Sequence, residues 1–215
     1  MTGDDAAGQA APIVGNVENK YAVRNPIARM LVNGFLSAFD RLTVVAGPPG
    51  RVLEAGCGEG ILSLRLAQAG WDVSGFDISA DLAAQAADLL AAHGFAGRFE
   101  GRDIYDLEPL AAAPELVVCC EVLEHLEEPG RALERLRDLG AAWYLLSVPR
   151  EPLWRLLNLV RLKYVGALGN TPGHLRHWSC RAFRRQVAEY FEIVEFSRPL
   201  PWQMALCRLR PSCPG

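Results

Sequence analysis

The fold class of this chain is decided by the stretch Val52-Leu-Glu-Ala-Gly-Cys-Gly-Glu-Gly60. A short apolar run leads into three glycines at alternating positions, a pattern typical of the turn between a buried strand and a helix. Glycine lets the backbone turn tightly and lets a ligand approach it closely. In open α/β sheets such a turn lies at the carboxyl end of a strand, where ligands bind. Alone, the pattern is weak evidence for any one cofactor, since it would also serve NAD.

Strand and helix patterns alternate on both sides of this turn. A helical repeat of apolar residues precedes it at 26–42. We expect buried strands at 51–55, 72–76, 98–101, 116–120 and 143–148, with helices at 59–69, 79–93 and 130–139. This alternation favours a parallel sheet covered on both faces. A helix at 179–190 and strands at 192–197 and 203–209 predict a closing hairpin. The predicted fold class is α/β, a doubly wound, mostly parallel seven-stranded sheet with a C-terminal antiparallel hairpin.

Composition favours one domain. The chain has 215 residues, of which 50% are hydrophobic, enough for one sizeable core. We expect a disordered lead-in at 1–19 and a single domain at 20–215. No apolar run reaches the ~20 residues of a membrane-spanning helix, and the first residues lack the basic-then-apolar order of a secretion signal. The six cysteines have no zinc-type spacing, which favours a reduced, cytoplasmic protein.

Charge is distributed unevenly along the chain. Residues 1–130 carry 8 basic and 19 acidic side chains, whereas residues 131–215 carry 14 basic and 6 acidic ones. The basic excess indicates either a solvated arginine-rich surface or attraction to an anionic acceptor or membrane. The apolar and basic segment 152–164 fits a lid helix, an interfacial helix making peripheral membrane contact, or a helix packed on the core. We expect a helical cap insertion near 150–178.

Two acidic residues follow the next two expected strands. Asp77 comes 21 residues after Gly56, at a position where a carboxylate accepts hydrogen bonds from the ribose hydroxyls of an adenosine. Asp103 follows the third expected strand and is placed to meet the adenine amino group. The glycines and the two carboxylates together favour an adenosine-bearing ligand over ordinary turn glycines and caps.

Three motifs resemble, in order, those of class I S-adenosylmethionine (SAM)-dependent methyltransferases. They are Glu-Ala-Gly-Cys-Gly-Glu-Gly at 54–60, Gly-Phe-Asp-Ile-Ser at 75–79 and Glu-Val-Leu-Glu-His-Leu at 121–126. The resemblance implies the Rossmann-like methyltransferase fold, with the glycines along the methionine part of SAM. It also implies that Asp77 holds the ribose and Asp103 the adenine ring. The implied cofactor-binding residues are Tyr21, Glu54, Gly56, Cys57, Gly58, Gly60, Asp77, Ile78, Asp103, Ile104 and Glu121, with Ile78 and Ile104 on either side of the adenine.

Glu121, Glu124 and His125 follow the fourth expected strand. If this segment is one helical turn, all three side chains lie on one face. Two carboxylates and an imidazole suit a divalent ion such as Mg²⁺ or Mn²⁺, and equally a general base with an orienting acid. Downstream, His174 and His177 are expected to return to the same edge of the sheet. We expect His125 and His174 to be catalytic. Any metal site would use Glu121, Glu124, His125 and His174.

This Glu-x-x-Glu-His pattern with a distant histidine resembles two metal-assisted groups, the ubiquinone-biosynthesis O-methyltransferases and the enzymes that methylate the terminal 2′-hydroxyl of small RNAs. The same motif also occurs in methyltransferases without a metal. The leading hypothesis is O-methylation of a small-molecule acceptor, either lipid-like or a natural product. N-methylation, small-RNA 2′-O-methylation, an NAD-dependent oxidoreductase and a non-catalytic SAM-binding module stay open. Nucleic acid is disfavoured because no added RNA-binding domain, stacking platform or long basic tail is visible.

Overall fold

The strands form one sheet in the order β3-β2-β1-β4-β5-β7-β6. Their bounds are β1 Arg51–Ala55, β2 Asp72–Asp77, β3 Gly97–Gly101, β4 Leu116–Cys120, β5 Trp143–Pro149, β6 Phe191–Ser197 and β7 Trp202–Leu209. Strands β1 to β5 pair in parallel, whereas β7 runs antiparallel to both β5 and β6. The predicted mostly parallel sheet and its terminal hairpin are therefore confirmed.

This computed structural model describes residues 25–151 and 175–210. The expected lead-in at 1–19, Tyr21, the lid or interfacial helix at 152–164 and His174 lie outside the described residues. So does most of the predicted cap insertion. In the described part of the chain, no helix is both long and apolar enough to cross a membrane.

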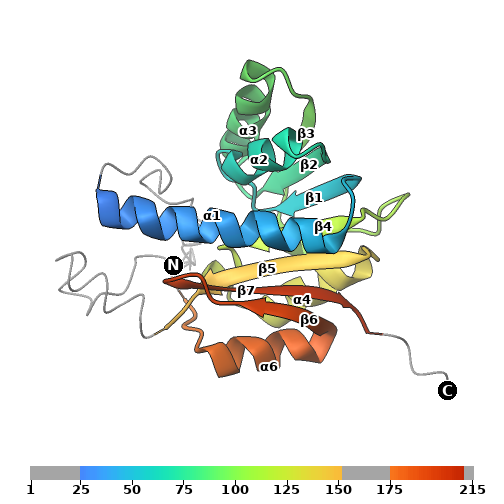
Figure 1. Ribbon diagram of the computed structural model, residues 1–215. Helices are drawn as coiled ribbons and strands as arrows, with labels where there is room; N and C mark the ends of the chain where they lie inside the picture. The colour runs from blue at the N-terminus through green and yellow to red at the C-terminus, as the bar shows by residue number, and fades with distance from the viewer. Residues whose placement is uncertain (1–24, 152–174, 211–215) are drawn as a thin grey trace, which may run out of the picture.

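Helices cover both faces of the sheet (Figure 1). Helices α1, α2 and α3 pack on one face and α4 and α6 on the other. Their bounds are α1 Pro26–Ala46, α2 Ile61–Gln68, α3 Ala80–Ala92, α4 Pro129–Asp138 and α6 Cys180–Tyr190, and two 3₁₀ turns, η1 Ile104–Asp106 and η2 Leu123–His125, follow β3 and β4. Because both faces are covered, every residue of β4 and β5 is buried.

Among the described helices, α1, α3 and α6 have N-terminal ends fixed by side-chain caps. Asn25 accepts a hydrogen bond from the Ile27 amide at 2.9 Å, with Pro26 as the first helical residue. Ser79, the predicted cap of α3, accepts one from the Leu82 amide at 3.3 Å. Such caps satisfy amides that have no partner within the helix, and each stabilises the fold by about 1 kcal/mol.

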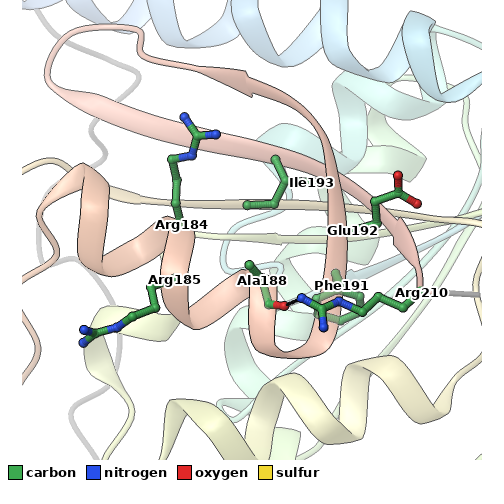
Figure 2. Close-up of a pocket in the computed structure, with 7 residues that line it drawn as sticks. All are labelled: Arg184, Arg185, Ala188, Phe191, Glu192, Ile193 and Arg210. Atoms are coloured by element: carbon green, nitrogen blue, oxygen red, sulfur yellow. Dashed lines mark hydrogen bonds between the residues drawn. The ribbon is translucent and has the colours of Figure 1, made fainter.

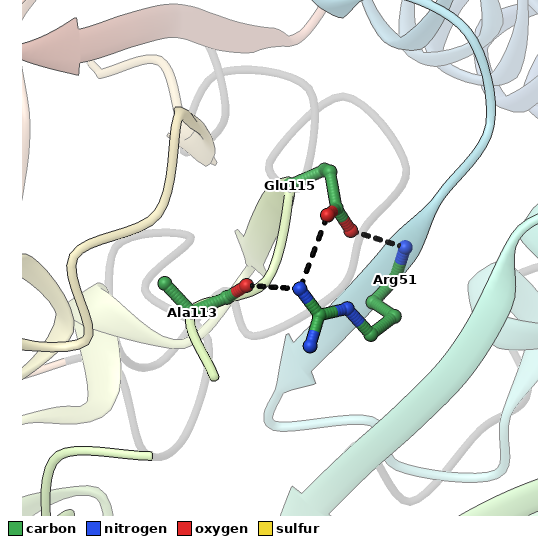
Figure 3. Close-up of polar contacts among 3 residues, drawn as sticks. All are labelled: Arg51, Ala113 and Glu115. Atoms are coloured by element: carbon green, nitrogen blue, oxygen red, sulfur yellow. Dashed lines mark hydrogen bonds and ion pairs between the residues drawn. The ribbon is translucent and has the colours of Figure 1, made fainter. Parts of the chain in front are cut away.

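The amino edge of the sheet is closed by an ion pair between β1 and the residue before β4 (Figure 3). Glu115 accepts from the Arg51 amide at 2.5 Å and from its guanidinium at 3.2 Å, and the same guanidinium donates to the Ala113 carbonyl at 2.8 Å. These bonds connect the start of β1 to the segment entering β4. They therefore help to set the register between β1 and β4, whose carboxyl ends lie at the site.

Candidate cofactor and methyl-transfer site

The glycine loop between β1 and α2 is tightly turned, as predicted. Gly56, Gly58 and Gly60 have φ angles of 74°, 51° and 82°. A Cβ on Gly56 would lie 2.3 Å from Val122 Cγ2, whereas a Cβ on Gly58 would meet no atom within 4 Å. Gly56 is therefore needed for packing inside the protein. Gly58 leaves open space in front of its backbone, where a ligand can approach.

Asp77 is held at the carboxyl end of β2 by two backbone amides. Its Oδ2 accepts from the Gly58 amide and its Oδ1 from the Ser79 amide, each at 3.0 Å. A carboxylate has about four acceptor positions, so both oxygens keep capacity for further hydroxyl donors. The side chain is thus fixed against the glycine loop in a position suited to a ribose.

The predicted adenine-binding residues differ in exposure. Ile78 is 53% exposed and Ile104 only 6%. Asp103 caps η1, where its Oδ1 accepts from the Tyr105 amide at 2.9 Å. The exposed side chain of Ile78, which follows Asp77 in the sequence, is placed where it can pack against a flat ring. Ile104 instead belongs to the hydrophobic core. Both assignments stay predictions.

Glu54 and Cys57 lie beneath the loop. Glu54 is 3% exposed, and the Ser63 hydroxyl of α2 donates to its carboxylate. The Cys57 amide donates to the Phe76 carbonyl at 3.0 Å. Burial raises the pKa of the Cys57 thiol well above its ordinary value. The Cys57 side chain is 6% exposed, and its backbone ties the loop to β2.

The expectation that residues 121–125 form one helical turn is wrong. Glu121 has a φ of 62°, in the left-handed region, and only Leu123–His125 form a 3₁₀ turn. The Glu121 carboxylate accepts from the Ser147 hydroxyl at 3.2 Å and from the Trp202 indole nitrogen at 2.7 Å. Glu121 is therefore directed toward β5 and β7 by these bonds and does not share a helical face with Glu124 and His125.

The chain after residue 174 returns to this same edge. The amides of Leu175 and Arg176 donate to the Glu124 carbonyl at 2.8 and 3.1 Å. His177 follows, with its Nδ1 3.5 Å from an oxygen of Glu151 at the end of β5. The prediction that this segment reaches the site edge is supported for His177, whereas His174 lies outside the described residues.

A metal site does not form from the described donors. Glu124 is 1% exposed, and the Glu121 carboxylate contacts Ser147 and Trp202. Within residues 25–151 and 175–210, no group of three His, Cys, Asp or Glu side chains is arranged to hold an ion. Because the predicted ligand His174 lies outside the described residues, the Mg²⁺ or Mn²⁺ site stays a prediction.

A separate cavity of about 510 Å³ lies between α6 and edge strand β6 (Figure 2). It is lined by Arg184, Arg185, Ala188, Phe191, Glu192, Ile193 and Arg210. None of these residues was predicted for the cofactor or the acceptor. Strand β6 is the sheet edge opposite β3, so this cavity is distinct from the glycine-loop site.

A family model described as a methyltransferase domain matches residues 30–196. The chain belongs to this methyltransferase family. The match includes the glycine loop, Asp77 and the 121–126 motif, so the fold and motifs are those of a class I SAM-dependent methyltransferase. This membership favours SAM over NAD as the cofactor.

The methyltransferase is similar to curated proteins and to solved structures. It is 32% identical over 130 residues to ribosomal RNA small subunit methyltransferase C of Alcanivorax borkumensis, covering 60% of this chain and 38% of the relative. It is 35% identical over 122 residues to the ubiquinone biosynthesis O-methyltransferase of Leptothrix cholodnii, covering 54% and 51%. The chain thus spans about half or less of these relatives' lengths.

Among solved structures, the magnesium protoporphyrin IX methyltransferase of Synechocystis with bound S-adenosylhomocysteine (SAH) aligns with a TM-score of 0.64. That chain is 27% identical, and the alignment covers 86% of this chain and 88% of that one. The likeness extends over most of both chains. It supports SAM as the cofactor of the family site built on β1, β2 and β4.

Two residues that contact Glu121 were not predicted from the sequence. Ser147 and Trp202 hold Glu121, yet they lie 26 and 81 positions away from it along the chain. Their only signal is position, since Ser147 belongs to β5 beside β4 and Trp202 to β7, the next strand of the sheet. A tryptophan at the first residue of an interior strand would have been the cue.

Proposed function

We propose that this chain transfers the methyl group of SAM to a hydroxyl oxygen of a small-molecule acceptor. The use of SAM is supported by the glycine loop. Open space lies in front of Gly58, and Asp77 accepts a hydrogen bond from the Gly58 amide. The acceptor half rests on the similarity to ubiquinone biosynthesis O-methyltransferases.

SAM supplies an electrophilic methyl group on a sulfonium. In the proposed reaction the acceptor oxygen forms a bond to the methyl carbon in line with the breaking carbon–sulfur bond, and the hydroxyl proton passes to a base. The chain's contribution is chiefly alignment. Holding two reactants in line removes much of the entropic part of the barrier, and the fixed Asp77 and the glycine loop suit that task.

We propose His125 as the base that takes the acceptor proton. It belongs to the 3₁₀ turn that directly follows β4 and is half-buried, and a histidine has an ordinary pKa near neutrality. His174 stays a second proposed catalytic residue. No metal is included in this proposal.

A ribosomal RNA methyltransferase among the relatives makes RNA the second acceptor class to test. The basic half of the chain offers charge for it, but phosphate binding by scattered arginines carries no base recognition. We therefore propose a small hydroxylated molecule as the acceptor, and short RNAs are tested beside it.

The test combines calorimetry and turnover. SAH and NAD are titrated into the purified chain, and radiolabelled SAM is then supplied with catechols, phenols, amines and short RNAs. We expect SAH binding, no NAD binding and methyl transfer to a hydroxyl acceptor. Transfer only to amines or only to RNA would replace the acceptor assignment, and SAH binding without turnover of any acceptor would favour a non-catalytic module.

A further inference from the structure

Glu121 stands in a costly backbone conformation at the centre of the sheet's carboxyl edge. Among the described residues it is the one non-glycine residue with positive φ, at 62°. An L-residue pays a steric penalty there, and such strain persists only where surrounding contacts enforce it. Contacts around Glu121 must therefore enforce this turn.

At least three hydrogen bonds hold Glu121. Its amide donates to the Ser147 carbonyl at 3.1 Å, and its carboxylate accepts from the Ser147 hydroxyl at 3.2 Å and the Trp202 indole at 2.7 Å. Of the two side-chain bonds, the one from the Trp202 indole is the shorter and comes from a buried ring. It therefore restrains the position of the Glu121 carboxylate.

The residue after Glu121 packs against the glycine loop. The next residue, Val122, lies so close to Gly56 that a Cβ there would sit 2.3 Å from Val122 Cγ2. Gly58, two residues further along the loop, has open space before it. A shift of the Glu121 turn would therefore move Val122 and release the loop that faces the ligand.

Trp202 is itself fixed from the other side. It is 5% exposed, and its ring packs edge-on against Phe35 of α1 with centroids 5.1 Å apart. It begins β7, where Pro149 at the end of β5 is its partner. The indole N–H is thus held in place by α1 and by two strands.

We propose that Trp202 is a positioning residue for the cofactor site. Through its indole N–H it holds the Glu121 carboxylate, and so keeps the left-handed turn and Val122 against the glycine loop. The inference rests on the proposed use of SAM. It assigns to the C-terminal hairpin a role in cofactor affinity that the sequence motifs do not include.

The experiment is a double-mutant cycle on SAH affinity, measured by calorimetry well below each variant's melting temperature. Trp202→Phe keeps a ring for Phe35 but removes the donor. We expect SAH to bind at least about tenfold more weakly to it, the scale of a hydrogen bond to a charged group. In a Glu121→Ala background, the same change should alter affinity less than about twofold, because the partner is already gone.

Trp143→Phe is the matched control. Trp143 is also a buried strand tryptophan, at 9% exposure, but it lies at the start of β5 under Arg208. Its replacement should leave SAH affinity unchanged. If Glu121→Ala does not fold, Glu121→Gln serves as the second background, and there Trp202→Phe should cost clearly less than in the parent chain.

The outcomes separate the two proposals. Absence of SAH binding to the parent chain would overturn the proposed function, and this inference with it. Parent binding with an unchanged Trp202→Phe affinity, even at a lower melting temperature, would overturn only the inference, because the tryptophan would then be structural. An equal loss in both backgrounds would also overturn it, since Trp202 would not be acting through Glu121.

Discussion

Replacing the loop glycines one at a time should separate packing from ligand contact. Alanine at Gly56 should lower the free energy of unfolding by about 1–2 kcal/mol, because the backbone there is left-handed. A further cost of about 1–3 kcal/mol arises because Val122 Cγ2 would be 2.3 Å away and must move. Gly58→Ala should show only the loss due to the left-handed backbone, since no atom lies within 4 Å of the added Cβ. We therefore expect about 2–5 kcal/mol of destabilisation for Gly56→Ala and about 1–2 kcal/mol for Gly58→Ala.

Ligand binding should rank these variants differently. If the cofactor lies against Gly58, a methyl group there meets it, and SAH affinity should fall at least ~10-fold, or about 1.4 kcal/mol. Gly94→Ala is the control, since its φ is 79° with no atom within 4 Å and it follows α3 at a distance from the loop. Urea unfolding gives the stabilities and calorimetry the affinities. Parent-like SAH binding by Gly58→Ala would refute the placement of the ligand at this glycine.

Three further predictions concern single charges and hydroxyls. Asp77→Asn should weaken SAH binding about tenfold or more, and it should also lower the urea midpoint, because its amide nitrogen cannot accept from the Gly58 or the Ser79 amide; unchanged affinity would contradict its ribose role. Burial raises the pKa of Tyr144 to about 12, so stability should fall as pH rises from the ordinary tyrosine value of about 10 toward 12. Tyr144→Phe should remove that part of the decline in urea midpoints, and an identical decline would contradict it. Arg51 lowers the pKa of Glu115, so this pair should stabilise above the ordinary carboxyl pKa and stop doing so as acid is added. Because both side chains are largely exposed, Glu115→Gln should cost within about 1 kcal/mol at pH 7 and nothing in acid, as unfolding at both pH values would show.

Local patterns predicted most of the fold. Strand β4 was predicted with its observed bounds because a run of five apolar residues ends at a motif with charged side chains. Ser79 was recognised as a cap from its place before a helical repeat. Helix α1 continues to Ala46, four residues beyond its predicted end. Leu42 and Ala46 are both buried on the sheet face, so packing prolongs the helix until Gly47.

The glycine loop and Asp77 could be placed from the sequence because they lie next to strand ends in sequence order. The surroundings of Glu121 could not, for two physical reasons. Glu121 adopts a left-handed conformation that no helical spacing rule anticipates for a glutamate. Its partners Ser147 and Trp202 come from other strands, and only the antiparallel placement of β7 beside β5 brings the tryptophan to it.

The order of strands in space also sets an order of folding. Strand β7 is the last of the described strands in the chain, yet it lies between β5 and β6. As long as β7 is undocked, β6 has no neighbour in the sheet and one side of β5 is open. An unpaired strand edge of this kind invites association with other chains. A chain that lost only the docking of β7 would therefore have its sheet in two pieces.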